Sequence, residues 1–278
     1  MEHINKSIVF KLVSLGAIIA FTIVLFSQLD TRTKIVFCDV GQGDAAYIRV
    51  VNKIDILIDA GSNEQILSCL GKHMPFYDRE IELAFITHPQ KDHYGGFIPI
   101  LERYRIKTMA VSLFEADGQN FNHLKDLVRS RKVLLRYINR GDSIKIHDSY
   151  IKVLWPTKQV LGTYKGHGQD PNYFSQVVEF SEGTFRALFT GDMDQETQVR
   201  LSAQPVPRFN ILKVPHHGSK NGLTAKFLSL ANPEVSVISV GKKNSYGHPN
   251  ISILDMLRAQ GSKIRRTDLE GDIVFKIN

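Results

Sequence analysis

The sequence predicts an α/β layered protein, and three observations support this fold class. From Lys34 to the C-terminus, short apolar runs alternate with stretches in which apolar residues recur at helical spacing. The chain has 278 residues, of which 43% are hydrophobic, enough for a sizeable buried core. No internal repeat or low-complexity tract interrupts the alternation. We therefore predict strands and helices that pack in layers.

Residues 1–30 form a separate segment, which we predict to be a membrane anchor or a signal segment. Ile8–Leu29 is almost entirely apolar or small, and its uncharged part, Leu12–Ser27, has 16 residues. A spanning helix needs roughly 17–25 residues, and Lys11 can extend the span by snorkelling. Because no small-x-small cleavage site follows, an uncleaved single-pass anchor is favoured over a cleaved signal peptide. Lys6 and Lys11 precede the segment and favour an extracytoplasmic globular domain.

Residues 31–278 form the predicted globular domain. Its predicted strands share apolar, β-branched or aromatic runs: Ile35–Asp39, Ala45–Val51, Ile54–Asp59, Leu83–Thr87, Ile144–Ile146, Ile151–Leu154, Phe174–Phe180, Thr184–Phe189, Asn210–Val214, Val235–Val240, Lys263–Arg266 and Asp272–Ile277. Its predicted helices share apolar residues three or four apart: Glu64–Leu70, Gly95–Tyr104, Phe121–Val128, Gln195–Leu201, Leu223–Leu230 and Ser252–Gln260. The glycine- and proline-rich stretch Thr157–Asn172 is the predicted loop.

Charge and cysteine content restrict the function less tightly. The formal net charge is +7, and residues 1–30 contribute none of the excess. This balance favours anionic partners such as nucleic acid, phosphorylated polymers or a membrane surface. Cys38 is predicted to be a buried strand residue and Cys69 to lie on a helix. Neither cysteine has metal-ligand spacing and two make no disulfide framework, so the redox compartment stays open.

Ionisable residues follow several of the predicted strands, where layered α/β proteins bind ligands. Taken singly, Asp59 fits a turn cap and Asp192 a helix N-cap, while His248 lies in a loop. The adjacent His216 and His217, in a Pro-His-His-Gly turn, are unusual as plain surface histidines. Core packing does not require a His or Asp at so many strand ends, which favours a functional site.

The strongest signal is the segment Thr87–His93. His88, Asp92 and His93 lie within six residues, after a buried strand and before a Gly-Gly helix start. Imidazoles and a carboxylate placed in this way can converge on one or two divalent cations. Zn²⁺, Mn²⁺ and Fe²⁺ all accept such mixed nitrogen and oxygen ligands. The segment therefore predicts a metal site.

From about Lys34 to Asn278 the chain resembles the metallo-β-lactamase superfamily, in particular the hydrolase domain of the ComEC-type DNA-internalisation proteins of competence. The resemblance rests on blocks that occur in a shared order: Cys38–Ala45, Ile58–Gly61, Thr87–His88, Asp92–Gly96, Thr190–Asp192, Val214–Ser219, Tyr246–Pro249 and Arg266–Asp272.

The resemblance implies a four-layer αββα sandwich with a metal site at the edge of its two sheets. It also implies roles for residues of the matched blocks: His88 in a first metal site, Asp92 and His93 in a second, Asp192 between them, His216 or His217 completing the shell, Asp59 orienting ligands from behind, and His248, Asn172 and Ser219 toward the substrate.

Two departures from the family pattern leave the number of metals open. The superfamily has a histidine where Gln90 stands, and the ComEC-type branch usually has an aspartate. A neutral glutamine is a poor ligand for these cations. The superfamily also has a histidine shortly before the Thr-Gly-Asp block, whereas Asp170–Ser175 has none and His167 lies in a glycine-rich loop. We therefore expect one or two divalent ions, Zn or Mn.

The function expected from these features is metal-dependent phosphodiester or nuclease chemistry on DNA at or outside the membrane. Asp92, Asp192 and His248 are the predicted catalytic residues, and Lys242 and Lys243, five residues before His248, are the best-placed contacts to a phosphate backbone. ComEC-type transporters fuse this domain to a many-helix channel, so we expect a separate channel partner or a stand-alone hydrolase. Another phosphorylated or ester substrate, or a non-catalytic DNA- or partner-binding module, are the alternatives.

Overall fold

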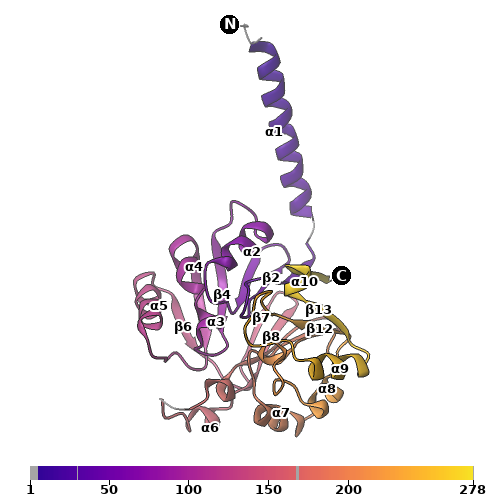
Figure 1. Cartoon of the computed structure of the whole chain (residues 1–278). Coiled ribbons are helices and arrows are strands. Elements are labelled where there is room, and N and C mark those ends of the chain that lie inside the picture. The colour runs from indigo at the N-terminus through magenta and orange to yellow at the C-terminus, as the bar shows by residue number, and fades with distance from the viewer. Residues whose placement is uncertain (1–5, 30, 167–168, 278) are drawn as a thin grey trace.

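The computed structural model describes residues 6–29, 31–166 and 169–277, whose strands form two seven-stranded sheets (Figure 1). The first sheet has the order β14-β1-β2-β3-β4-β5-β6. Its strands are β14 (Ile273–Ile277), β1 (Thr33–Phe37), β2 (Ala46–Val50), β3 (Ile54–Ile58), β4 (Glu80–Ile86), β5 (Arg105–Val111) and β6 (Leu134–Tyr137). The second sheet is β13 (Lys263–Arg266), β12 (Val235–Ile238), β11 (Ile211–Lys213), β10 (Phe185–Phe189), β9 (Val177–Glu182), β8 (Ser149–Trp155) and β7 (Ser143–Ile146), in that order.

Helices cover the outer face of each sheet, which confirms the predicted αββα layers. The first sheet packs against α2 (Gln65–His73), α4 (Phe97–Arg103) and α5 (Gln119–Ser130). The second packs against α7 (Gln195–Ser202), α8 (Ala225–Ala231) and α9 (Ile251–Ala259). Short connecting helices are α3 (Lys91–Tyr94), α6 (Lys158–Leu161), α10 (Thr267–Glu270) and the 3₁₀ turns η1 (Pro171–Phe174) and η2 (Pro215–Gly218).

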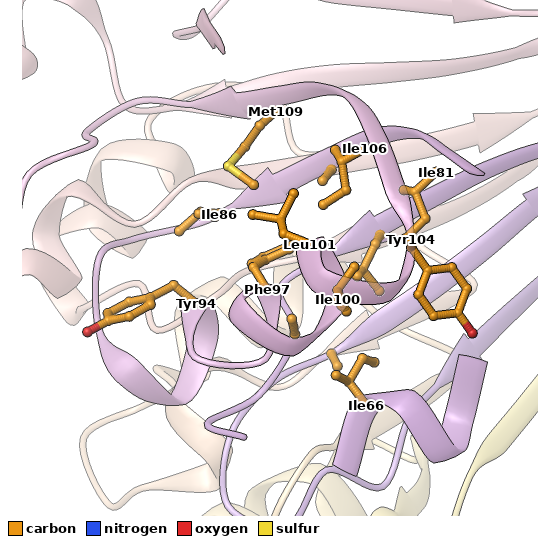
Figure 2. Close-up of a cluster of buried hydrophobic side chains, with 14 of the residues drawn as sticks. Ile66, Ile81, Ile86, Tyr94, Phe97, Ile100, Leu101, Tyr104, Ile106 and Met109 are labelled. Carbon is orange, nitrogen blue, oxygen red and sulfur yellow. The ribbon is translucent and has the colours of Figure 1, made fainter. Parts of the chain in front are cut away.

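The period of two along the strands explains how one chain fills three apolar layers. In β1, Ile35 and Phe37 lie in the core between the two sheets, whereas Val36 faces the helices. Figure 2 shows the helical counterpart, in which Phe97 and Leu101 of α4 point into the layer between that helix and the first sheet. A strand buried on both faces reads as a continuous apolar run, which is why such runs predicted most strands correctly.

Two strands of the first sheet are absent from the predicted elements. On β5 the outward side chains are charged, and Lys107 pairs with Glu80 and Glu82 of β4. The edge strand β6 is mostly exposed. β5 has an apolar run of only three residues, Met109–Val111, and β6 begins with only two, Leu134 and Leu135. Pairing with β4 and with each other therefore identifies these strands. The strand predicted from Phe174 begins at Val177 instead, because Pro171 starts the 3₁₀ turn η1.

The N-terminal segment contains helix α1 (Lys6–Leu29), which extends away from the sheets in Figure 1. Across the described ranges of the chain, no helix combines the length and the apolar character that membrane crossing requires. The predicted membrane span therefore has no support from the structure. Residues 1–5 and Asp30, which belong to the predicted anchor, lie outside the described residues.

Cys38 and Cys69 form a disulfide, so the expectation of no disulfide framework is wrong. Cys38 directly follows β1, Cys69 lies on α2, and their Cα atoms are 5.7 Å apart. Both side chains are buried. The pairing depends on how α2 packs on the first sheet, and a sequence separation of 31 residues gives no hint of it.

We expect loss of this disulfide to destabilise the domain. Because the cross-link closes a loop of 31 residues, replacing both cysteines by serine should lower the free energy of unfolding by about 2–4 kcal/mol. Urea denaturation with a metal chelator present would measure the change. Reduced wild-type protein is the control and should match the double variant. Equal stability of the oxidised wild type and the variant would contradict the expectation.

Candidate metal centre

Segments that leave the carboxyl ends of strands in both sheets meet at one edge of the sandwich. Asp59 follows β3, Asp92 and His93 lie on α3 after β4, and Asp192 follows β10. His217 lies in η2 after β11. Each sheet therefore supplies part of the site, and the residues come together only when the two sheets pack against each other.

Asp59 holds His93 from behind. Its Oδ1 accepts a hydrogen bond from the Thr87 amide at 2.8 Å, and its Oδ2 accepts one from the Thr87 hydroxyl at 2.7 Å. The same Oδ2 lies 2.8 Å from Nδ1 of His93, which donates to it. Nε2 of His93 then points into the site, 3.4 Å from Oδ2 of Asp192. This is the geometry in which a carboxylate fixes the tautomer of a ligand histidine, beyond what a turn cap needs.

The structure separates the two adjacent histidines. Nδ1 of His217 donates to the Ser239 carbonyl at 3.0 Å, which leaves Nε2 3.3 Å from Asp92 Oδ2 and 3.5 Å from Asp192 Oδ2. His217 is buried, whereas the His216 side chain is 38% exposed and its Nε2 lies 4.0 Å from Asp192. Both have positive φ angles, near +50°, so the turn directs neighbouring side chains to different sides. His217 is thus the histidine that faces the carboxylates.

Asp92, His93, Asp192 and His217 fit a divalent cation. One donor atom from each lies within 4.8 Å of all the others. Nε2 of His93 and Oδ1 of Asp192 are buried and have no hydrogen-bond partner among the described residues, although buried polar atoms are rarely left so. Two imidazoles and two carboxylates form a donor set that Zn²⁺ and Mn²⁺ accept. The arrangement supports a metal site in which these four residues are the ligands.

The protonation states of Asp192 and His217 favour binding of a cation. Burial by itself would raise the pKa of Asp192, but the nearby charges of His217 and His93 hold it well below its ordinary value. For His217, burial would lower the pKa, but the Asp192 and Asp44 carboxylates raise it to about 10. Without a cation, protons on the histidines therefore balance the buried carboxylates. A bound cation would replace these protons, so metal uptake should release them.

His88 lies beside this cluster but is paired with Gln90. Its Nε2 is 3.0 Å from Oε1 of Gln90, and its Nδ1 is 3.4 Å from the Ser175 hydroxyl. Burial and the neighbouring charge of His93 lower the pKa of His88 to about 3, so the ring is neutral. A neutral imidazole that accepts from Ser175 at Nδ1 donates its Nε2 proton to Gln90. Nε2 of His88 is therefore hydrogen-bonded to Gln90 and is not free to bind a first metal ion.

Asp44 and Lys213 also belong to the site and are missing from the predicted residues. The Lys213 ammonium forms a short ion pair with Asp44 and lies 3.7 Å from Oδ1 of Asp192. Oδ1 of Asp44 lies 3.2 Å from Nδ1 of His217. The loop before Asp44 needs Gly43, because a Cβ there would lie 2.3 Å from the Asp92 carbonyl oxygen. A lysine in the buried strand β11 was the available signal, since lysine is rarely buried without a partner.

We expect Lys213→Met to destabilise the protein by about 3–5 kcal/mol, because the change leaves the Asp44 carboxylate buried without its main counter-charge. The Lys213 side chain is only 4% exposed, so solvent cannot screen the loss. Urea denaturation would measure it. Lys220→Met is the matched control, since Lys220 is exposed and the change should stay within about 0.5 kcal/mol. Equal stabilities of the two variants would show that the ion pair contributes little.

An open cavity of about 480 Å³ leads to the cluster. His248 lies at its rim, with its ring 6.0 Å from that of His216 and 5.7 Å from that of Tyr246, on which it stacks. Burial and the charges of His217 and His216 lower the pKa of His248. The residues that line the cavity lie on loops and turns of both sheets and include Gln42, Asn63, Gln90, Asp192, His216 and Tyr246.

None of the remaining predicted substrate contacts is among the described lining residues of this cavity. Lys242 and Lys243 are exposed on the loop after β12 that also carries His248. Asn172 is buried in η1, and Ser219 directly follows η2. His167, the histidine nearest in sequence to the missing ligand, lies outside the described residues.

Comparison with known proteins identifies the family. The family model of the metallo-beta-lactamase superfamily matches residues 38–242 of the chain. The chain belongs to this superfamily. It is 25% identical to ComE operon protein 3 of Bacillus subtilis, aligned over 93% of this chain and 35% of that protein. It is 34% identical to Competence protein ComA of Neisseria gonorrhoeae, aligned over 88% of this chain and 32% of that protein.

The chain thus spans about a third of the length of these curated relatives. Among solved structures, it is similar to the metallo-beta-lactamase fold protein YhfI of Bacillus subtilis, with a TM-score of 0.57, 11% identity and coverage of 88% of this chain and 100% of that one. At such low identity the likeness shows the fold alone. The superfamily membership and the similarity to competence proteins confirm the resemblance inferred from the sequence blocks.

Proposed function

We propose that this superfamily member is a metal-dependent phosphodiesterase or nuclease that acts on DNA and uses one divalent cation, Zn²⁺ or Mn²⁺. The observation that carries the proposal is the cluster of Asp92, His93, Asp192 and His217 below an open cavity. A bound divalent cation supplies Lewis-acid chemistry, which activates a water and polarises a phosphoryl oxygen. One cation is proposed because Gln90 engages His88.

The residues at the rim of the cavity support hydrolysis of a phosphodiester. His248 and the half-exposed His216 lie near the cluster, where their imidazoles can hydrogen-bond to the phosphate or to a departing oxygen. Lys242 and Lys243 precede His248 on the same loop, are exposed, and can contact phosphates of a bound strand. The net charge of +7 favours an anionic polymer, and the likeness to proteins named for competence favours DNA.

We further propose that the domain works outside the cytoplasm, together with a separate channel protein. Disulfides persist mainly in oxidising compartments, and the buried Cys38–Cys69 bond fits such a location. The likeness to proteins named for competence supports a setting of DNA uptake, in which a channel protein would be the partner.

A metal panel tests the proposed activity. The full chain would be stripped of metal, reloaded with Zn²⁺ or Mn²⁺ and tested on single-stranded DNA, double-stranded DNA and a chromogenic phosphodiester. We expect metal-dependent cleavage with about one ion per chain. Cleavage of other phosphate or carboxylic esters but not of DNA would support a different hydrolase. Binding of DNA with no cleavage of any substrate would leave a non-catalytic module and refute the enzyme.

A further inference from the structure

A second group of metal-ligand side chains lies away from the catalytic cavity, around the disulfide. One donor atom from each of Cys69, His73 and Asp272 lies within 4.8 Å of the other two. The sulfur of Cys38 is bonded to that of Cys69, so it lies at the same place. Two sulfurs, one imidazole and one carboxylate are therefore clustered at the end of strands β1 and β14 of the first sheet.

The fold explains why these four residues meet. Phe37 of β1 pairs with Ile273 of β14, so the adjoining residues Cys38 and Asp272 leave the sheet side by side. Cys69 and His73 are four residues apart on α2, which places both on one face of that helix. The disulfide joins α2 to the residue after β1, and the contact of His73 with Asp272 joins it to the residue before β14.

The polar members of the group are already oriented. Nε2 of His73 lies 3.1 Å from Oδ2 of Asp272, and Oδ1 of the same carboxylate accepts a hydrogen bond from the Asp39 amide at 2.9 Å. Lys72 lies 3.4 Å from Asp272, but its side chain is 63% exposed and can turn into solvent. The sulfurs are buried, whereas His73 and Asp272 are 18% and 10% exposed, so a cation can enter from their side.

We propose that reduction of the Cys38–Cys69 disulfide creates a zinc site formed by Cys38, Cys69, His73 and Asp272. A dithiol reductant gives two electrons and two protons to the sulfurs, which become two thiols while the dithiol becomes a disulfide. Binding of Zn²⁺ then releases both thiol protons, because the thiolate is the ligand. Two thiolates with one imidazole and one carboxylate suit tetrahedral Zn²⁺.

The proposal implies that α2 and β1 are connected in both redox states, by a disulfide when oxidised and by a zinc ion when reduced. In the oxidised chain a covalent bond ties α2 to the end of β1, and in the reduced chain a zinc ion ties the same elements together and adds Asp272. A newly made chain has reduced thiols, so the zinc form would hold this edge of the sheet before the disulfide forms. The loop from Asp39 to Asp44, which reaches the catalytic cluster, starts directly at this connection.

Cobalt spectroscopy of the full chain tests the proposal without reference to activity. Cobalt bound by thiolates gives a strong near-ultraviolet charge-transfer band, which a site of histidines and carboxylates does not produce. We expect this band in the reduced protein, loss of the band when Zn²⁺ is added, and no band in the oxidised protein. Metal analysis should find one more zinc per reduced chain than per oxidised chain.

Variants identify the ligands. Loss of an outer partner of a metal ligand costs about 10–100-fold in affinity, so loss of the direct ligand in His73→Ala or Asp272→Asn should weaken zinc binding by the reduced chain more than ~100-fold. His123→Ala, at an exposed histidine of another helix, should not weaken it. Equal zinc content in both redox states, no thiolate band, or a reduced chain that unfolds even with zinc present would each overturn the proposal. Loss of the catalytic metal would leave the band unchanged, so this result is independent of the proposed hydrolase activity.

Discussion

Asp192→Ala should abolish metal binding by the cluster of Asp92, His93, Asp192 and His217, and with it the proposed hydrolysis. Oδ2 of Asp192 lies 3.4 Å from Nε2 of His93 and 3.5 Å from Nε2 of His217, so this carboxylate is central among the candidate ligands. Changes of residues that only support a ligand cost about 10–100-fold in metal affinity or activity, so loss of the central ligand should cost more than ~100-fold. Metal analysis and kcat/KM on a phosphodiester would measure both effects.

Asp194→Ala is the matched control for this change. Asp194, not Asp192, is the N-cap of α7, and its side chain accepts a hydrogen bond from the Thr197 amide at 2.8 Å. Its loss should cost about 1 kcal/mol of stability and leave metal content and kcat/KM unchanged. If Asp192→Ala retained wild-type metal content and activity, the site would be wrongly assigned.

Gln90→His should raise the metal content from about one ion per chain to about two. In the wild type, Gln90 engages Nε2 of His88 and offers only a neutral amide. A histidine at position 90 adds a second imidazole ligand next to His88. The negative charge of Asp192, which acts on His88, would favour binding of a second cation. Because two cations can hold both the attacking and the leaving oxygen, phosphodiester cleavage should increase as well.

Gln90→Met is the control, because it breaks the hydrogen bond to His88 without adding a ligand. We expect its metal content to stay at one. Titration calorimetry with Mn²⁺, checked by metal analysis of the dialysed protein, separates the outcomes. A second ion in the Gln90→Met protein would mean that His88 binds metal without help from position 90. A single ion in Gln90→His would mean that another feature closes the first site.

Local sequence patterns were sufficient for much of the fold and part of the site. Continuous apolar runs predicted the strands that are buried on both faces, and helical spacing predicted the covering helices. Thr87–His93 places a buried strand, a tight turn and α3 in direct succession, so Asp92 and His93 could be predicted to lie at one strand end. β5, whose first half carries Arg105 and Lys107, and the exposed strand β6 lacked such a pattern and were missed.

Other features depend on contacts between distant parts of the chain. The choice of His217 over His216 follows from positive φ angles in η2 and from the Ser239 carbonyl, neither of which a sequence displays. Gln90 could be recognised as a departure from the family pattern, but its bond to His88 required the coordinates.

The sequence by itself determined the layered α/β class, the family blocks and the strand ends that carry His and Asp. Only the tertiary structure decided that Asp44 and Lys213 join the site, that His88 is engaged by Gln90, and that Cys38 meets Cys69. The physical reason is the range of the interactions. Periodicity and turn chemistry act over a few residues, whereas a metal centre and a disulfide require side chains that only the packing of two sheets and a helix brings within a few ångströms.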